Sequence, residues 1–373
     1  MRVLTIFGTR PEAIKMAPVI KALEELPGVT HAACVTGQHR QMLDSVLSHF
    51  QIRPAFDLNI MRPGQTLSAI TSAILDRLGA VIDFFQPDWV VVQGDTTSAF
   101  SGALAAFYKQ CRVAHVEAGL RTGNLSSPWP EEANRRLIAP LAALHFAPTP
   151  RAADNLRREG VAERALLVSG NTVIDSLQHV ARQLETDQRL QAQLDARFAF
   201  LDPSKRLILV TGHRRENFNG GLARVCRAIA ALCRARSDIE FVYPVHLNPN
   251  VQQVARTAFS DCNAVHLIAP QEYVPFVYLM RRACLIVTDS GGIQEEAPGL
   301  GKPVLVTRDT TERPEAIEAG AARLVGTSSE GLEAAIADLL DNAAAYEAMA
   351  QARHPFGDGQ AARRIARRMV EYG

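Results

Sequence analysis

Short apolar runs alternate with longer amphipathic segments along most of the 373-residue chain, and this alternation limits the fold to few classes. In the first half, the apolar runs lie at residues 3–7, 33–36, 89–93, 113–116, 144–147 and 166–169. They are apolar almost throughout, as expected of strands that are buried on both faces of a parallel sheet. The segments between them, such as residues 13–26 and 66–85, have helical periodicity. The pattern predicts a doubly wound α/β domain.

The same alternation begins again after a polar stretch at residues 189–202. Further apolar runs lie at residues 207–211, 239–244, 264–268, 285–288, 304–306 and 322–325. We therefore expect two Rossmann-like domains in tandem, one at residues 1–170 and one at 171–358. The remaining residues, about 359–373, predict an Arg-rich amphipathic helix that could pack back on either domain, and we assign it to the first.

Composition argues against several classes of protein. Lys and Arg total 40 and Asp and Glu total 39, so the net charge of +1 indicates neither nucleic acid nor a membrane surface as partner. No apolar run approaches the roughly 18 residues of a membrane helix, and the first run is too short for a signal peptide. The six cysteines form no CxxC pair and no zinc-spaced cluster. We expect a cytoplasmic protein with buried thiols and no bound metal.

In open parallel sheets, ligands bind beyond the carboxyl ends of the strands, so the residues that follow each strand are the candidates for a site. Arg10 and Lys15 follow the first strand, close to the start of a predicted helix. Cations are unfavourable there, and a bound anion would explain both. The alternative is a solvated loop arginine and a surface lysine. The segment lacks the GxGxxG dinucleotide pattern.

Three carboxylates follow later strands of the first domain. Asp95 comes just after residues 89–93, Glu117 comes just after residues 113–116, and Glu131 lies near the start of a predicted helix. Taken singly, Asp95 could cap a helix, and Glu131 could form a surface pair with Arg135. Taken together on one side of a sheet, such acids raise one another's pKa and suit general acid/base chemistry.

Polar residues also follow the strands of the second domain. His213 comes after the first strand and could be an acid, a base or a phosphate contact, or could simply bond to the backbone. Gln271 and Phe276 could flank a flat base, although core packing is the alternative for Phe276 and the favoured role for Tyr278.

The segment Ser290-Gly291-Gly292 connects a strand to a helix. Backbone N–H groups at such a helix start attract anions, and glycines let a phosphate approach closely. A plain strand-to-helix turn is the alternative. Arg313 follows the next strand, where it is either an anion contact or a solvated loop cation.

Nine segments of the chain together resemble the bacterial non-hydrolysing UDP-N-acetylglucosamine 2-epimerases. They run from the first strand to the last helix, so the resemblance covers essentially the whole chain. The segments are GTRPEAIKMAPVI, TGQHRQML, VQGDTTSA, HVEAGLRT, PEEANRR, GNTVIDSL, TGHRREN, DSGGIQEEAPGLGKPVLVTRDTTERPE and PFGDGQAARRI.

The resemblance implies a glycosyltransferase-B-like fold with the active site in the interdomain cleft, and a homodimer. It implies reversible conversion of UDP-N-acetylglucosamine into UDP-N-acetylmannosamine, a surface-polysaccharide precursor, without metal or nicotinamide. UDP would leave by elimination, giving 2-acetamidoglucal, and then add back. The residues implied in catalysis are Asp95, Glu117, Glu131 and His213. Those implied in substrate binding are Arg10, Lys15, Asp95, Glu117, His213, Gln271, Phe276, Ser290, Gly291, Gly292, Glu296 and Arg313.

The segment Ser290–Glu296 then predicts a two-part grip on the nucleotide, in which backbone amides bind the diphosphate and Glu296 binds the ribose hydroxyls. Glu295 is assigned no role. The resemblance also implies an activator site that includes Gln38, His39 and Gln41. Some relatives carry an arginine where Gly64 stands in this chain.

Three other functions fit the same architecture. A retaining glycosyltransferase would transfer the sugar to an acceptor, and a hydrolysing epimerase would release UDP and free N-acetylmannosamine. A nucleotide-sugar sensor would bind without turnover, but it would have no need of Asp95, Glu117 and Glu131 together.

Overall fold

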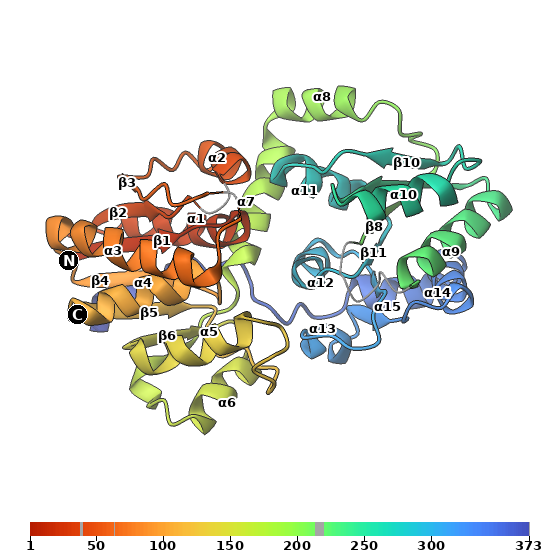
Figure 1. The fold of residues 1–373 in the computed structure, drawn as a ribbon. Coiled ribbons are helices and arrows are strands. Elements are labelled where there is room, and N and C mark those ends of the chain that lie inside the picture. The colour runs from red at the N-terminus through yellow and green to blue at the C-terminus, as the bar shows by residue number, and fades with distance from the viewer. Residues whose placement is uncertain (38–39, 63, 213–219, 373) are drawn as a thin grey trace. The chain divides into compact units, whose positions relative to one another are not determined.

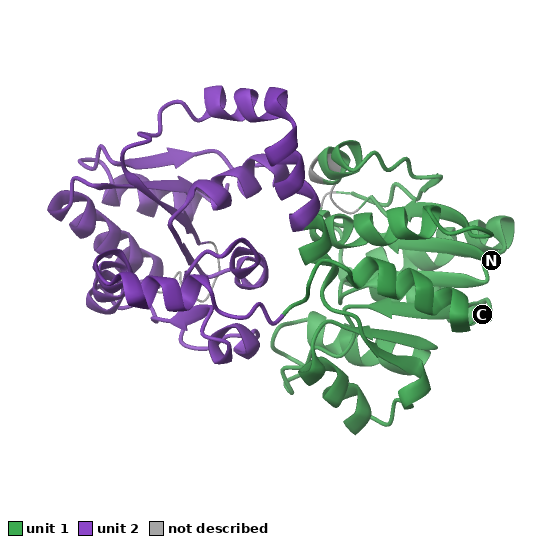
Figure 2. Cartoon of the chain, turned by 180° about the vertical axis from the view of Figure 1, so that it is seen from behind, with its two compact units in different colours: residues 1–176, 356–373 green, residues 177–355 purple. Residues whose placement is uncertain are grey.

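A computed structural model of the chain describes residues 1–37, 40–62, 64–212 and 220–372 (Figure 1). These residues form two compact units (Figure 2). Unit 1 comprises residues 1–176 and 356–373, and unit 2 comprises residues 177–355. Each unit is a parallel sheet with helices, so the predicted α/β class with two Rossmann-like units is confirmed.

Unit 1 is built on a seven-stranded sheet with the order β3-β2-β1-β4-β5-β6-β7. Its strands are β1 (Arg2–Phe7), β2 (Thr30–Val35), β3 (Phe56–Asp57), β4 (Trp89–Gln93), β5 (Arg112–Val116), β6 (Leu144–Ala147) and β7 (Leu166–Val168). Its helices are α1 (Arg10–Glu24), α2 (Arg40–His49), α3 (Leu67–Phe85), α4 (Thr97–Tyr108), α5 (Glu131–Ile138), α6 (Pro150–Arg158) and α16 (Ala361–Tyr372), with the start of α7 (Thr172–Thr186).

Unit 2 is built on a six-stranded sheet with the order β10-β9-β8-β11-β12-β13. Its strands are β8 (Arg206–Thr211), β9 (Ile239–Pro244), β10 (Val265–Ile268), β11 (Leu285–Thr288), β12 (Val304–Val306) and β13 (Ala322–Leu324). Its helices are α8 (Gln188–Arg197), α9 (Gly221–Ala235), α10 (Pro249–Ala258), α11 (Tyr273–Arg282), α12 (Gly291–Glu296), α13 (Pro314–Glu318), α14 (Ser329–Asp341) and α15 (Ala343–Ala350), with the rest of α7.

In both sheets the chain order reverses once, between β1 and β4 in unit 1 and between β8 and β11 in unit 2. All paired strands run parallel, so their carboxyl ends lie at one edge of each sheet. In sheets of this kind, the ligand binds at that edge beside the reversal. The fold therefore marks the segments after β1 and β4, and those after β8 and β11, as candidates for a site.

Every predicted strand is present within three residues of its expected ends. The largest difference is at β2, which begins at Thr30 because it pairs with β1 from Arg2↔Thr30 onward, although its first two residues are polar. Among the strands in the described part of the chain, β3 alone was not predicted, because a strand of two residues is too short to show a pattern.

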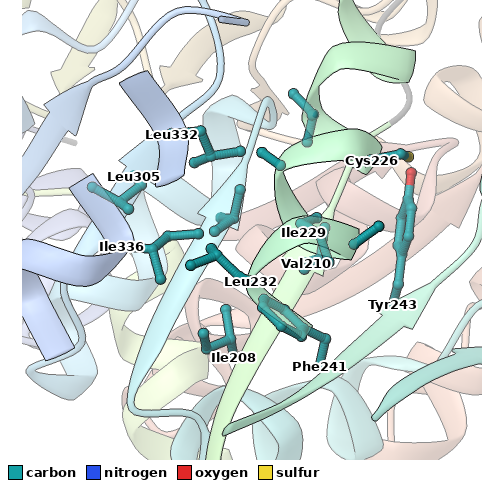
Figure 3. Close-up of a cluster of buried hydrophobic side chains, with 14 of the residues drawn as sticks. Ile208, Val210, Cys226, Ile229, Leu232, Phe241, Tyr243, Leu305, Leu332 and Ile336 are labelled. Atoms are coloured by element: carbon teal, nitrogen blue, oxygen red, sulfur yellow. The ribbon is translucent and has the colours of Figure 1, made fainter. Parts of the chain in front are cut away.

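Buried aliphatic and aromatic side chains hold the helices of each unit on its sheet. Figure 3 shows the core of unit 2, where side chains from β8, β9, α9, β12 and α14 converge. The labelled residues are Ile208, Val210, Cys226, Ile229, Leu232, Phe241, Tyr243, Leu305, Leu332 and Ile336. Such a core fixes the strand ends that carry the site, because close-packed interiors resist small displacements.

The final helix α16 belongs to unit 1, where it packs against α1. Its apolar face carries Ile365 and Met369, both fully buried. The Asp175 carboxylate accepts hydrogen bonds from the backbone N–H groups of Ala361 and Ala362, at 3.3 and 2.9 Å, and so satisfies donors at the start of α16. Among the described helices, none has the length and apolar character needed to cross a membrane.

Two glycines of unit 1 allow backbone strain to be separated from close packing. Gly119 and Gly160 have similar φ angles, 90° and 87°. A Cβ on Gly119 would lie 2.2 Å from the Ala152 carbonyl oxygen, whereas a Cβ on Gly160 would have no neighbour within 4 Å among the described residues. We expect Gly160→Ala to lower the free energy of unfolding by about 1 kcal/mol, and Gly119→Ala to lower it by about 1–3 kcal/mol more. Urea unfolding of the two variants measures this difference, and equal losses would contradict it.

Candidate functional site

The segments after β1, β4 and β5 meet at the carboxyl edge of the unit 1 sheet. Gln93 pairs with Val116 in the sheet, and the Gly94 N–H donates to the Val116 carbonyl at 2.9 Å. Asp95 and Glu117 therefore follow adjacent strand ends. Because β1 lies on the other side of β4, the start of α1, with Arg10 and Lys15, lies at the same edge.

Lys15 is paired with Glu117. The Lys15 Nζ lies 2.5 Å from Glu117 Oε2, and both side chains are mostly buried. The alternative of a surface lysine is therefore wrong. Glu117 itself has a φ of 62°, a left-handed conformation that is uncommon for a residue other than glycine. Such strain is often found at functional sites, where the surrounding structure holds the residue in place.

Asp95 is held by helix α5. The Nε and Nη2 atoms of Arg135 lie 2.8 and 2.7 Å from the same oxygen, Asp95 Oδ2, and Asn134 Nδ2 donates to the Asp95 carbonyl at 2.8 Å. Asp95 does not cap α4, because Thr96 occupies that position and accepts from the Ala99 N–H. The capping alternative is therefore wrong, and the predicted group of acids is interleaved with cations.

Glu131 is the first residue of α5 and is half-buried. The contacts described for Arg135 are with Asp95 and Glu132 rather than with Glu131. The start of α5 is thus fixed beside Asp95 by Asn134 and Arg135, which lie one turn after Glu131.

Glu12 is a fully buried carboxylate that joins the β1 and β4 segments. It accepts from the Gly8 and Thr9 N–H groups at 3.0 and 2.7 Å, and from the Thr96 hydroxyl at 2.6 Å. Burial raises the pKa of Glu12, against the lowering effect of these hydrogen bonds. Glu12 therefore ties the start of α1 to the start of α4.

His115 supports the Gly94 peptide from within β5. Its Nε2 lies 2.7 Å from the Gly94 carbonyl oxygen, which can only accept, so Nε2 carries the proton. Burial lowers the pKa of His115 to about 3, which keeps the ring neutral at physiological pH. The neutral tautomer thus helps to fix the chain just before Asp95.

In unit 2, the segment Ser290–Gly292 follows β11 and begins α12. Ser290 is the N-cap residue, but its hydroxyl makes no capping hydrogen bond. Among the described residues, the atoms nearest to a Cβ on Gly292 would be Glu296 Oε1 and Ser290 Oγ, at 3.9 and 4.0 Å. Packing of these residues therefore does not require a glycine here, and within the described part of the chain the space beside Ser290 and Glu296 is open.

The two acids of α12, Glu295 and Glu296, contact side chains of neighbouring segments. Glu295 is buried and forms an ion pair with Arg313, and the neighbouring Gln294 Oε1 accepts from the Thr311 hydroxyl at 2.5 Å. Glu296 Oε2 accepts from the Tyr273 hydroxyl at 3.0 Å. Arg313 is therefore not a solvated loop cation, and Glu295, which was assigned no role, holds it in place.

Gln271 lies two residues before α11, and Phe276 lies within that helix. Both ends of the Gln271 side-chain amide are engaged, because Oε1 accepts from Arg197 at 2.7 Å and Nε2 donates to the Ala269 carbonyl at 2.6 Å. Phe276 is half-buried among buried neighbours. Tyr278 stacks on Phe198 with ring centroids 5.5 Å apart, which confirms its expected place in the core.

Three predicted site residues cannot be placed. His213, Gln38 and His39 lie outside the described residues, and nothing is described of the Gln41 side chain in α2. Gly64 lies in the segment before α3 with a φ of 72°. Within residues 1–37, 40–62, 64–212 and 220–372, no group of three or more His, Cys, Asp or Glu side chains is arranged to hold a metal ion.

Sequence comparisons show to which family the chain belongs. The sequence model for UDP-N-acetylglucosamine 2-epimerase matches residues 21–370. The chain belongs to that family. The UDP-N-acetylglucosamine 2-epimerase of Escherichia coli K12 is 54% identical over 365 residues, which cover 98% of this chain and 97% of that protein. A probable UDP-N-acetylglucosamine 2-epimerase of Ralstonia nicotianae is 55% identical over 371 residues, covering 100% and 99% of the two chains.

Solved structures of UDP-N-acetylglucosamine 2-epimerases share the fold. The enzyme from Neisseria meningitidis, bound to UDP-N-acetylglucosamine, superposes with a TM-score of 0.94 at 48% identity, and both chains are fully covered. The enzyme from Methanocaldococcus jannaschii, in complex with UDP-N-acetylglucosamine and UDP, gives 0.83 at 33% identity, again over both full chains. The predicted epimerase family is therefore confirmed.

Several polar residues at these edges of the epimerase chain were missed by sequence reasoning. Two pairs of them had a local signal. Thr9 and Glu12 have the spacing of a capping box, and Glu132 and Arg135 have the i,i+3 spacing of a helical pair. The contacts between distant segments, such as Arg135 with Asp95, had none.

Because His115 is neutral in the folded chain, we expect acid to lower the stability of the fold. Its pKa is lowered on folding, so the stability that depends on the neutral ring is present above pH 6.5 and is lost as pH falls towards about 3. We expect His115→Asn, which keeps a donor, to reduce the slope of unfolding free energy against pH by about 1.4 kcal/mol per pH unit below pH 6. Urea unfolding between pH 7 and pH 5 measures the slope. An unchanged slope in the variant would show that His115 is not the group that takes up the proton.

Proposed function

We propose that the chain interconverts UDP-N-acetylglucosamine and UDP-N-acetylmannosamine without hydrolysing either. The observation that carries the proposal is the set of three carboxylates, Asp95, Glu117 and Glu131, on elements that adjoin at the carboxyl edge of the unit 1 sheet. Membership of the epimerase family supplies the substrate.

The chemistry explains why carboxylates are needed. C2 of the pyranose has no neighbouring carbonyl, so its proton cannot be removed to give a stabilised enolate. Elimination avoids this difficulty: a carboxylate takes the C2 proton, the C–H electron pair forms the C1=C2 double bond, and the C1–O pair leaves with UDP. The intermediate is 2-acetamidoglucal. Return of a proton to the opposite face of C2 and addition of a UDP oxygen to C1 complete the inversion.

Proton transfer on two faces requires at least two groups that handle protons. Asp95, Glu117 and Glu131 are the candidates in unit 1. Lys15 at Glu117 and Arg135 at Asp95 hold two of these carboxylates in place before substrate arrives. Groups that are already oriented need no reorganisation during the reaction, which is a main source of enzymatic rate.

Unit 2 supplies groups suited to the nucleotide. The open space at Gly292 lets a diphosphate approach the backbone, and Glu296 can accept hydrogen bonds from ribose hydroxyls. Negative charge grows on the diphosphate as the C1–O bond breaks. A donor fixed beside it, as Arg313 is fixed by Glu295, can lower the barrier by about 3–4 kcal/mol. We also propose that His213 takes part in this site, as the family resemblance implies.

Proton NMR of UDP-N-acetylglucosamine incubated with the protein in D2O distinguishes the proposed epimerase from a hydrolysing epimerase, a glycosyltransferase and a sensor. We expect intact UDP-N-acetylmannosamine with deuterium at C2. Free N-acetylmannosamine and UDP would indicate a hydrolysing epimerase. No change in the substrate would indicate a sensor, or a glycosyltransferase that lacks its acceptor.

We further propose that the chain acts in the cytoplasm and supplies a precursor of surface polysaccharide. We also propose that it forms a homodimer. Support for the dimer comes from α3 and α4, whose carboxyl ends are joined by the Lys109–Asp83 ion pair and expose Phe84, Phe107 and Tyr108. Large apolar side chains gathered on a surface favour burial against a second chain. Light scattering of the purified chain would contradict the dimer by giving the 40.7 kDa mass of one chain.

Replacement of Asp95 tests the role of the carboxylates. We expect Asp95→Asn to retain UDP binding, because the proposed nucleotide contacts are elsewhere, and to lose at least 100-fold in C2 exchange, the lower range for loss of a general acid or base. The measurements are calorimetry with UDP and deuterium incorporation by NMR. Unchanged exchange would remove Asp95 from the mechanism.

Replacement of Gly292 tests the nucleotide site. A Cβ would come no closer than 3.9 Å to the neighbouring side chains that the structure describes, so we expect Gly292→Ala not to lower the unfolding midpoint. The added methyl group should crowd the diphosphate and weaken UDP binding by about tenfold or more. Calorimetry measures the affinity, and unaltered UDP binding would place the diphosphate elsewhere.

A further inference from the structure

Helix α5 directs several polar residues into the interior of unit 1. The carboxyl group of Glu132 is fully buried, and Asn134 and Arg135 are buried beside it. Buried charges are unfavourable unless they are paired and hydrogen-bonded, so each needs partners that the fold must provide. The hydrogen-bond and ion-pair partners of these side chains show which segments the arrangement holds together.

Three nitrogen atoms of Arg135 contact two carboxylates, those of Asp95 and Glu132. Nε and Nη2 converge on Asp95 Oδ2, and Nη1 donates to Glu132 Oε2 at 3.1 Å. Only a planar guanidinium, with its fixed fork of donors, can make this set of contacts at once. Asp95 Oδ1 has no hydrogen-bond partner in the part of the chain that the structure describes, and a quarter of the Asp95 side chain is exposed.

Glu132 fixes Arg135 and a second segment. Its Oε2 accepts from the Thr122 N–H at 3.1 Å and its Oε1 from the Gly123 N–H at 3.2 Å. The segment that begins at Glu117 is thereby joined to α5. Glu132 thus anchors the guanidinium on the side away from Asp95.

We propose that Arg135 and Glu132 are positioning residues for the epimerisation, and this inference rests on the proposed function. Arg135 holds one oxygen of Asp95 and leaves Oδ1 to the substrate, while Glu132 holds Arg135 in that orientation. Since Glu131 belongs to the same helix, the contacts of Asn134 and Arg135 also fix Glu131 relative to Asp95. Two of the proposed proton-handling groups therefore act as one preorganised pair.

The adjacent arginine provides a matched control. Arg136 lies on the same helix and has the same charge, but its side chain is nearly half exposed and its described contact is a 3.6 Å approach to Glu132. It makes no described contact with Asp95. We therefore expect Arg136→Lys to keep the positive charge, the helix and the activity. Arg135→Lys should keep the positive charge and the helix but lose activity.

The experiment compares wild-type protein with Arg135→Ala, Arg135→Lys, Glu132→Gln and Arg136→Lys. Misplacement of a catalytic group by about 1 Å can cost on the order of 100-fold in rate. We expect kcat and C2 deuterium exchange to fall by about that factor in Arg135→Ala, and by about tenfold or more in Arg135→Lys and Glu132→Gln, as a smaller misplacement. KM and the UDP dissociation constant should stay within about threefold, because the lost contacts act on the reacting group rather than on uniform binding. Arg136→Lys should match wild type.

Chemical rescue distinguishes positioning from general stability. Guanidinium, added below denaturing concentrations, should restore part of kcat in Arg135→Ala, because it can occupy the space beside Asp95 Oδ2. If Arg135→Ala does not fold, Arg135→Lys keeps the buried positive charge and carries the test. Wild-type kcat in Arg135→Lys would overturn the inference, and so would equal losses in Arg135→Lys and Arg136→Lys. An inactive wild-type protein would instead refute the proposed function, and this inference with it.

Discussion

Parallel pairing of β1, β4 and β5 is the constraint on which the site of unit 1 depends. The Gln93↔Val116 register places Asp95 and Glu117 at adjacent strand ends, and β1 places Arg10 and Lys15 at the same edge. A shift of one residue in either pairing would turn every side chain that follows to the other face. Buried apolar strands make such a shift costly, so the packing of the core fixes the geometry of the polar residues.

Ion pairs between buried side chains are a second feature that fixes the candidate site residues. Lys15 holds Glu117, Arg135 holds Asp95, and Glu295 holds Arg313. In each pair, the side chain that holds its partner is buried or nearly so. The two acids of α12 therefore have separate roles, since Glu296 binds the ribose in the proposed grip and Glu295 orients the Arg313 cation.

Sequence patterns predicted the elements well because buried parallel strands are continuous apolar runs, which are visible without knowledge of their neighbours. They also placed Asp95 and Glu117 at strand ends, since both directly follow such runs. They did not predict Arg135 as the partner of Asp95, because that contact joins residues 40 apart and depends on how α5 packs. Glu295 was assigned no role for the same reason, because its partner Arg313 lies 18 residues further along the chain, at the start of α13.

The central claim, that UDP leaves C1 and returns during each inversion at C2, can be tested with isotopically labelled substrate. UDP-N-acetylglucosamine is prepared with oxygen-18 in the bridge between C1 and the β-phosphorus and is incubated with the wild-type protein. If the C1–O bond breaks, rotation of the β-phosphate moves the label into non-bridging positions, which phosphorus NMR detects in the recovered nucleotide sugars. We predict such scrambling in intact UDP-N-acetylglucosamine and UDP-N-acetylmannosamine. Epimerised product that keeps all of its label in the bridge would contradict the account.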